Sequence, residues 1–267
     1  MCIGSKHNRL AMSVKVIAIA NQKGGVGKTT TTLTLATALT RMGKRALVLD
    51  LDPHACASLH MRLYPESQTH TLYDLFLADE EQRPAIWRET IKKSTEQLHI
   101  APASIRLSEL EIDLHTRRNK GTILVESLQQ VQHEYDYVLM DCPPHVGILL
   151  INALVACDLL IIPIQTDFLA LYGLKLLFDT MNTLNKVLPA PVRYMALPTM
   201  YDRRARACTR VLELLRAKMG RAMFTSIIGI DTRLREASAQ GCVVYDLDPQ
   251  SRGALAYAAL AKEIVAL

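Results

Sequence analysis

A glycine-rich segment near the start of the chain constrains its fold more than any other feature. It reads NQKGGVGKTT at residues 21–30, directly after an apolar run at 14–20 and before a helix-length stretch that begins near residue 29. Gly24, Gly25 and Gly27 let the backbone curl its N–H groups around phosphate oxygens at the positive end of a helix. A strand, a glycine turn and a helix in this order predict a phosphate-binding α/β fold.

Two residues at the end of this segment add chemistry to the predicted turn. The strict pattern G-x-x-x-x-G-K-[ST] fails, because Gln22 stands where its first glycine would fall. Lys28 and Thr29 nevertheless occupy the positions at which a lysine bridges the β- and γ-phosphates and a hydroxyl ligates Mg²⁺. A glycine turn without a ligand is the alternative. The joint occurrence of strand, glycines, Lys-Thr and helix argues against it.

Apolar runs and amphipathic segments alternate along the rest of the chain. Because the apolar runs are continuous, they predict strands that are covered on both faces, as in a mostly parallel sheet. Strands are predicted at 14–20, 45–50, 98–101, 137–141, 159–164, 192–197 and 225–228. Helices are predicted at 29–42, 71–79, 83–93, 121–134, 148–156, 168–187, 204–219 and 250–265.

This order predicts one doubly wound α/β domain over residues 13–267, with ligands bound at the carboxyl ends of strands. Residues 1–12 are expected to be disordered, with Met12 as a candidate start of translation. Apolar runs such as 159–164 fall far short of the ~20 residues that span a membrane. The six cysteines have no CxxC pair and no metal-ligand spacing. We therefore expect reduced thiols in a cytoplasmic protein.

Carboxylates end two of the predicted strands. Asp50 and Asp52 lie on the same side of the end of the strand 45–50, because side chains alternate along a strand. Two carboxylates so close repel each other unless a cation or an ordered water uses them. Asp141 ends the apolar run 137–141 in the Walker B manner, which predicts that it holds Mg²⁺ through water.

Lys23 at the start of the glycine segment completes the deviant Walker A signature KGGxGK[ST]. With it the sequence resembles the ParA/MinD family of dimerising ATPases. In that family the early lysine reaches across a nucleotide-sandwich dimer, which implies that Lys23 touches the partner's ATP. The resemblance also implies that Asp52 positions the attacking water and that Asp50 supports Mg²⁺. The family commonly continues DPQGN, whereas residues 52–56 read DPHAC, and we expect His54 to be a surface residue of the loop rather than a catalytic base.

The resemblance extends from residue 14 to the end and favours the ParA branch over MinD. It implies that the DxPP element at 141–144 senses the γ-phosphate and that Thr199 and Met200 lie near the adenine. The last helix lacks the basic amphipathic character of a membrane-binding tail, so no membrane partner is expected. The expected nucleotide contacts are Lys23, Gly24, Gly25, Val26, Gly27, Lys28, Thr29, Thr30, Thr199 and Met200.

Basic charge is concentrated in one window. The whole chain carries +5, whereas residues 193–221 hold eight basic and two acidic residues. Family members bind DNA without sequence preference through an arginine surface, so the resemblance implies a DNA-facing role here. The candidate contacts are Arg203, Arg204, Arg206, Arg210, Arg233 and Arg235. A solvated basic helix face is the alternative.

Together these features predict a homodimer that binds ATP and Mg²⁺ and holds double-stranded DNA non-specifically. Slow ATP hydrolysis is expected to release the protein from the DNA. A ParB-like or cargo adaptor protein is expected to stimulate hydrolysis, and the expected location is the nucleoid. The predicted role is segregation of DNA or positioning of cargo such as chemosensory arrays. The alternatives are a P-loop metabolic enzyme of the same fold, a MinD-like regulator of division or flagellar placement, and an adaptor that binds ATP without hydrolysing it.

Overall fold

A computed structural model describes residues 14–167 and 174–267. Within them, seven strands form one sheet in the order β3-β4-β2-β5-β1-β6-β7. The strands are β1 (Lys15–Ile19), β2 (Ala46–Asp50), β3 (Lys92–Lys93), β4 (Leu98–Ala101), β5 (Tyr137–Asp141), β6 (Leu159–Gln165) and β7 (Tyr194–Thr199). Every neighbouring pair is parallel except β3 with β4, which confirms the predicted fold class. Two predictions fall outside the described residues: the disorder of residues 1–12 and the start of the helix 168–187.

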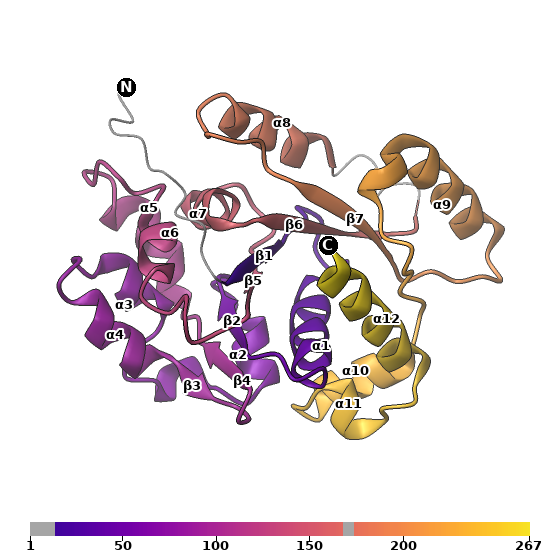
Figure 1. The fold of residues 1–267 in the computed structure, drawn as a ribbon, viewed down its shortest axis with the longest axis horizontal. Coiled ribbons are helices and arrows are strands. Elements are labelled where there is room, and N and C mark those ends of the chain that lie inside the picture. The colour runs from indigo at the N-terminus through magenta and orange to yellow at the C-terminus, as the bar shows by residue number, and fades with distance from the viewer. Residues whose placement is uncertain (1–13, 168–173) are drawn as a thin grey trace.

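Helices cover both faces of this sheet (Figure 1). They are α1 (Lys28–Thr40), α2 (Cys56–His60), α3 (Leu72–Leu77), α4 (Arg83–Thr90), α5 (Leu110–Asp113), α6 (Ile123–Leu128), α7 (Ile148–Ala156), α8 (Leu174–Asn185), α9 (Arg206–Met219), α10 (Thr232–Ala239), α11 (Val244–Leu247) and α12 (Arg252–Ala266). Short 3-10 turns lie at Pro65–Ser67, Ile105–Glu109 and Gly220–Ala222. No helix among the described residues is both long and apolar enough to cross a bilayer.

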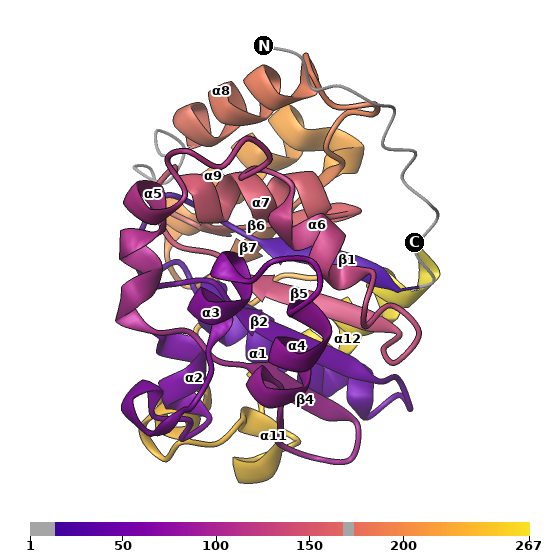
Figure 2. The ribbon, with the colours of Figure 1, turned by 90° about the vertical axis from the view of Figure 1, so that its left-hand side faces the viewer.

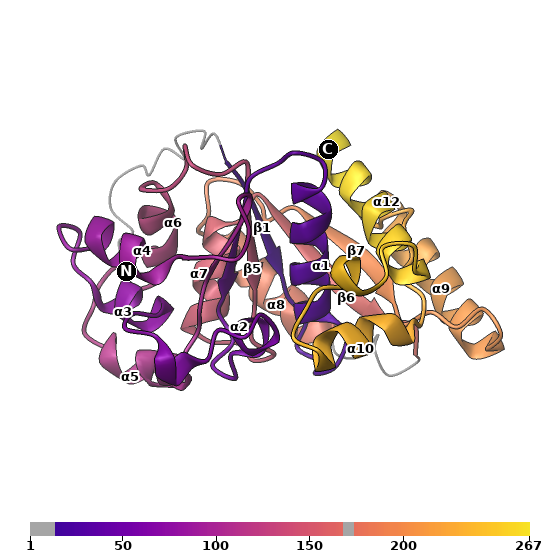
Figure 3. The same cartoon turned by 90° about the horizontal axis from the view of Figure 1, so that it is seen from below.

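The alternation of side chains along each strand creates two apolar cores. In β1, Val16 and Ala18 belong to the core under α6, α7 and α8, whereas Ile17 and Ile19 belong to the core under α1, α11 and α12. Figure 3 shows α1, α10 and α12 together on the second face. Because the central strands are buried on both faces, their sequences are continuously apolar, as expected of a parallel sheet.

The predicted strand at 225–228 is wrong. The chain there runs beside β7 and makes two isolated bridges, Ala196 to Met223 and Tyr201 to Gly229. Between them, the Glu263 carboxylate of α12 accepts the backbone N–H groups of Thr225 and Ser226 at 2.9 and 2.7 Å. These donors are therefore withdrawn from a ladder with β7. The predicted helix 83–93 is too long, because α4 ends at Thr90 and the edge strand β3 follows at Lys92–Lys93. The helices α2, α5, α10 and α11 were not predicted.

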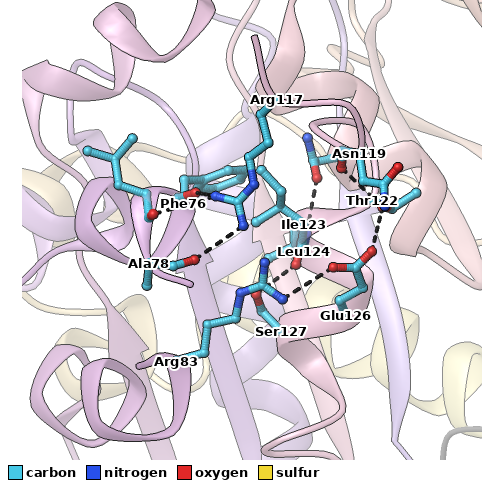
Figure 4. Close-up of polar contacts among 12 residues, drawn as sticks. Phe76, Ala78, Arg83, Arg117, Asn119, Thr122, Ile123, Leu124, Glu126 and Ser127 are labelled. Atoms are coloured by element: carbon cyan, nitrogen blue, oxygen red, sulfur yellow. Dashed lines mark hydrogen bonds and ion pairs between the residues drawn. The ribbon is translucent and has the colours of Figure 1, made fainter. Parts of the chain in front are cut away.

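Two arginines tie the helices α3, α4 and α6 to neighbouring segments. Figure 2 shows these helices on one side of the molecule, and Figure 4 shows the arginine side chains. The buried guanidinium of Arg83 on α4 donates to the Glu126 carboxylate of α6 at 3.2 Å. Arg117 donates to the carbonyl oxygens of Phe76 and Ala78 at 2.9 and 3.3 Å, at the end of α3. Arg117 satisfies carbonyl groups that the end of a helix leaves without partners, and Arg83 links α4 to α6, so this layer is fixed by polar contacts as well as by packing.

Candidate functional site

The glycine segment forms an open turn between β1 and α1. Gly25 and Gly27 have φ angles of 71° and 90°, in the left-handed region that favours glycine, and nothing lies within 4 Å of the point where their Cβ atoms would stand. The Thr199 hydroxyl of β7 donates to the Val26 carbonyl at 2.9 Å and fixes the turn. The backbone therefore borders empty space in front of the first turn of α1, where the helix dipole favours an anion.

Two lysines of this turn have different surroundings. Lys28 is almost fully buried, and its Nζ donates to the Lys23 carbonyl at 3.3 Å. Lys23 Nζ contacts Asp167 Oδ2 at 2.6 Å and Gln165 Oε1 at 3.3 Å, both at the end of β6. The Lys23–Asp167 pair is about one-third exposed on each side, so water screens it. In the single chain, the Lys23 ammonium is thus held by its own sheet.

The predicted carboxylates at the ends of β2 and β5 are brought together. Asp50 and Asp141 are register partners on adjacent parallel strands, and both are buried. Asp50 accepts hydrogen bonds from the backbone N–H of Ser58 at 2.8 Å and from its hydroxyl at 2.7 Å. Asp141 Oδ1 accepts a weak bond from Thr32 at 3.4 Å, whereas its buried Oδ2 has no hydrogen-bond partner among the described residues.

Burial raises the pKa values of both carboxyls, and the charge of a neighbouring aspartate adds to the rise, Asp52 for Asp50 and Asp50 for Asp141. For Asp141, burial is the largest cause, followed by the charge of Asp50, whereas Thr29 and Lys28 oppose the rise. For Asp50, burial is again the largest cause, and the hydrogen bonds of Ser58 oppose it. A divalent cation would relieve this repulsion, and the unsatisfied Oδ2 of Asp141 is an oxygen ligand of the type that Mg²⁺ prefers.

Asp52 lies two residues beyond Asp50 at the mouth of the site. Its backbone N–H donates to Asp50 Oδ1 at 3.2 Å, which links the two aspartates. Its own Oδ1 accepts from the His54 backbone N–H and contacts the His54 ring Nδ1, both at 3.0 Å. The His54 side chain is 72% exposed, so it is a surface residue of the loop and also contacts Asp52.

Two adjoining cavities run along the glycine turn. One, of about 580 Å³, is lined by Lys28, Thr29, Asp52 and His54. The other, of about 460 Å³, is lined by Thr199, Ile228, Ile230 and Tyr257. They share the lining residues Gly27, Thr30, Met200 and Ser238. One cavity is rich in charged and hydroxyl groups and the other in apolar ones, so together they match a phosphate chain joined to a nucleoside.

Comparison with known proteins decides the family. A family model described as an AAA domain matches residues 14–192. The sporulation initiation inhibitor protein Soj of Bacillus subtilis is 37% identical over 253 residues, which cover 94% of this chain and 98% of Soj. The chromosome partitioning protein ParA of Caulobacter vibrioides is 34% identical over 258 residues, covering 96% and 95% of the two chains. This chain belongs to the ParA/MinD family of P-loop ATPases.

Solved structures agree with membership of this ATPase family. Cobyrinic acid a,c-diamide synthase from Mycobacterium smegmatis, solved with bound ADP and magnesium, has a TM-score of 0.78 and 28% identity, with 94% of each chain covered. McdA of Cyanothece, solved in complex with ATP, has a TM-score of 0.81 and 20% identity, with 96% of this chain and 97% of McdA covered. At that identity, the likeness to McdA concerns the fold alone.

The arginines predicted from the ParA resemblance lie on different elements. Figures 1 and 3 show α9 beyond the β7 edge and α10 near the start of α1. Arg206 and Arg210 are exposed on α9, and Arg203 is exposed just before it. Arg204 is bound in a fork to Asp202 through Nε at 3.0 Å and Nη2 at 2.9 Å.

The arginines of α10 have further partners. Arg233 contacts Glu236 at 2.7 Å and Asp248 at 3.5 Å. Arg235 lines the apolar cavity instead of pointing away from the site.

Several lining residues of this ParA-family site were missed in the sequence. The apolar cavity is lined by Ile228, Ile230 and Tyr257, which lie far from the glycine turn in sequence. No sequence motif indicated these residues. Gln165 and Asp167 stood in a segment that resembled the family, but nothing in their spacing indicated a contact with Lys23. Their place just after the predicted strand 159–164 was the available signal, since ligands gather at the carboxyl ends of parallel strands.

Proposed function

We propose that this ParA-like partition ATPase is an ATP-dependent dimer that binds DNA without sequence preference and releases the DNA when ATP is hydrolysed. The observation that carries the proposal is the joint presence of a phosphate-sized open turn, the buried Asp50–Asp141 pair and the signature Lys23 at the carboxyl ends of neighbouring strands. A damaged site would have lost one of these parts. The substrate is ATP, and the required metal is Mg²⁺.

The phosphate groups of ATP would lie in the glycine turn. The backbone at Gly24, Gly25 and Gly27 borders open space, so its N–H groups would bind the phosphate oxygens, and Lys28 would provide the cation beside the β- and γ-phosphates. Thr29 and Asp141 would hold the metal, with Asp50 behind them. Bound Mg²⁺ neutralises charge on the phosphate oxygens.

Hydrolysis requires a water aligned with the γ-phosphorus. Asp52 is placed for this task, because its carboxylate lies at the rim of the phosphate cavity and is 12% exposed at its side chain. A carboxylate that only orients water, without a stronger base, gives slow turnover. Slow turnover suits a switch that holds one state for a long time.

Lys23 would change partners when the dimer forms. The contact with Asp167 is an exposed ion pair, which stabilises a protein by less than about 1 kcal/mol, so the ammonium leaves it at little cost. In the dimer, Lys23 would reach the ATP of the second copy. Closure would then depend on ATP.

The DNA-facing surface would combine the arginines of α9 with those of α10 from a closed dimer. Exposed Arg203, Arg206 and Arg210 give a phosphate-binding face without information about base sequence. We place the protein in the cytoplasm on nucleoid DNA, and an adaptor protein would trigger hydrolysis. The cargo would be DNA or a protein assembly such as a chemosensory array.

The decisive experiment measures ATP binding, turnover and DNA retention in matched variants. Lys28→Ala should abolish ATP binding, whereas Lys186→Ala, which changes an exposed lysine on a distant surface, should not. Asp52→Ala should bind ATP and accumulate a dimer that retards unrelated DNA duplexes in a gel. Normal turnover in Lys28→Ala, or an Asp52→Ala protein that stays monomeric with ATP, would contradict the proposal.

A further inference from the structure

The His54 ring contacts the carboxylate that the proposed function assigns to the attacking water. Its Nδ1 lies 3.0 Å from Asp52 Oδ1, and the backbone N–H of the same residue donates to the same oxygen at 3.0 Å. An ionised carboxylate can only accept, so Nδ1 carries the proton of this bond. His54 therefore donates two hydrogen bonds to one oxygen of Asp52, one from its backbone N–H and one from its ring Nδ1.

The other oxygen of Asp52 stays open to the cavity. Among the hydrogen bonds of the described residues, none ends on Asp52 Oδ2, and the side chain retains 12% exposure. A carboxylate held at one oxygen cannot rotate freely about its Cβ–Cγ bond. Its second oxygen then points in one direction, which reduces the entropy lost when a water is aligned.

We propose that His54 is a positioning residue for ATP hydrolysis: it locks Oδ1 of Asp52 so that Oδ2 accepts the hydrogen bond of the attacking water. This inference rests on the proposed function, because it assumes that Asp52 orients that water. It adds a residue at which this chain departs from the usual DPQGN sequence of its family, since residues 52–56 read DPHAC.

The strained backbone beside His54 supports an ordered loop. Ala55 has a φ angle of 53°, a left-handed conformation that alanine rarely adopts, and it is held by a bond from its N–H to the Asp52 carbonyl at 2.8 Å. The side chain of Ala55 is 3% exposed, so packing also holds it. His54 thus projects from a turn whose geometry is fixed on both sides of its Cα.

The experiment compares three substitutions of His54 in the full-length protein. Asn places an amide nitrogen close to the position of Nδ1, Gln places one near Nε2, and Ala removes both. His54→Ala and His54→Gln should lower kcat about tenfold with KM for ATP within about twofold, as expected when one hydrogen bond to a charged group is lost. His54→Asn should keep kcat within about threefold of the wild-type value. Added imidazole should restore part of the rate of His54→Ala.

His115→Ala is the matched control, because His115 is exposed, contacts the Ile112 carbonyl at 2.7 Å through Nδ1 and lines neither cavity of the site. It should leave kcat unchanged. Wild-type turnover in His54→Ala would overturn this inference, provided that Asp52→Ala is inactive in the same assay. Absence of ATPase activity in the wild-type protein, or activity in Lys28→Ala, would instead overturn the proposed function.

Discussion

Asp50 and Asp141 end neighbouring parallel strands as register partners, and both carboxylates are buried. Asp50 accepts the backbone N–H of Asp52, which lines the phosphate cavity. Two negative charges in this position cost free energy in the nucleotide-free protein, because burial and repulsion both disfavour ionisation. The same arrangement becomes favourable when a divalent cation is present. The site therefore stores an electrostatic cost that metal binding relieves.

Replacing Asp141 should expose that cost. Its pKa is raised in the folded protein from 3.8 to about 8, so folding is penalised increasingly as the pH rises between these values. Asp141→Asn removes the penalty, and each unit of pKa shift corresponds to about 1.4 kcal/mol. Without Mg²⁺ and nucleotide, the variant should gain free energy of unfolding relative to wild type at pH 8 and lose that gain at pH 4. Urea denaturation at both pH values measures the difference.

Magnesium and ATP provide the control for this prediction. They should stabilise the wild type more than Asp141→Asn at pH 8, because only the wild type offers both carboxylates to the cation. A difference in stability that is the same at both pH values would show that ionisation of Asp141 does not penalise folding.

The exposed arginines of α9 should contribute more to DNA binding than Arg233. Arg206 and Arg210 have no ion-pair partner among the described residues, whereas Arg233 contacts Glu236 and Asp248. Releasing Arg233 from these carboxylates offsets part of what a phosphate contact gains. Arg210→Ala should weaken binding of the ATP-bound protein and reduce the slope of log affinity against log salt by about 1. Titrations of fluorescent duplexes at several salt concentrations measure both quantities.

Arg88→Ala is the control for this comparison, because Arg88 is exposed on α4, far from α9 in Figure 1. It should leave affinity and salt slope unchanged. A larger loss in Arg233→Ala than in Arg210→Ala would show that the α10 arginines dominate, in spite of their carboxylate partners.

The buried pair of Arg83 and Glu126 should be essential for stability. Arg83 is 3% exposed, so Glu126→Ala leaves a buried guanidinium without its counter-ion and should cost about 3 kcal/mol of unfolding free energy. Glu109→Ala, which removes the partner of the exposed Arg106, should cost less than about 1 kcal/mol. The fluorescence of Trp87, the one tryptophan of the chain, reports unfolding of this region in urea. Equal losses in the two variants would contradict the role of burial.

Consecutive residues determined much of the fold and the polar part of the site. The turn at 21–30 and the apolar runs that end in Asp50 and Asp141 are local signals, since glycine conformations and strand periodicity depend on neighbours in sequence. The same reasoning placed a strand at 225–228, where local β propensity lost to the distant Glu263 carboxylate. Roles assigned to Lys23 and Asp52 remain predictions.

The sequence by itself determined that this chain forms a parallel α/β sheet with a phosphate turn after the first strand and acidic residues at two later strand ends. Only the tertiary structure decided that Lys23 contacts Asp167 and that Ile228 and Tyr257 complete an apolar cavity. The physical reason is the separation of the interacting residues along the sequence. Backbone conformation is set by adjacent residues, whereas side-chain partners such as Lys23 and Asp167 meet only after the strand order has brought their segments together.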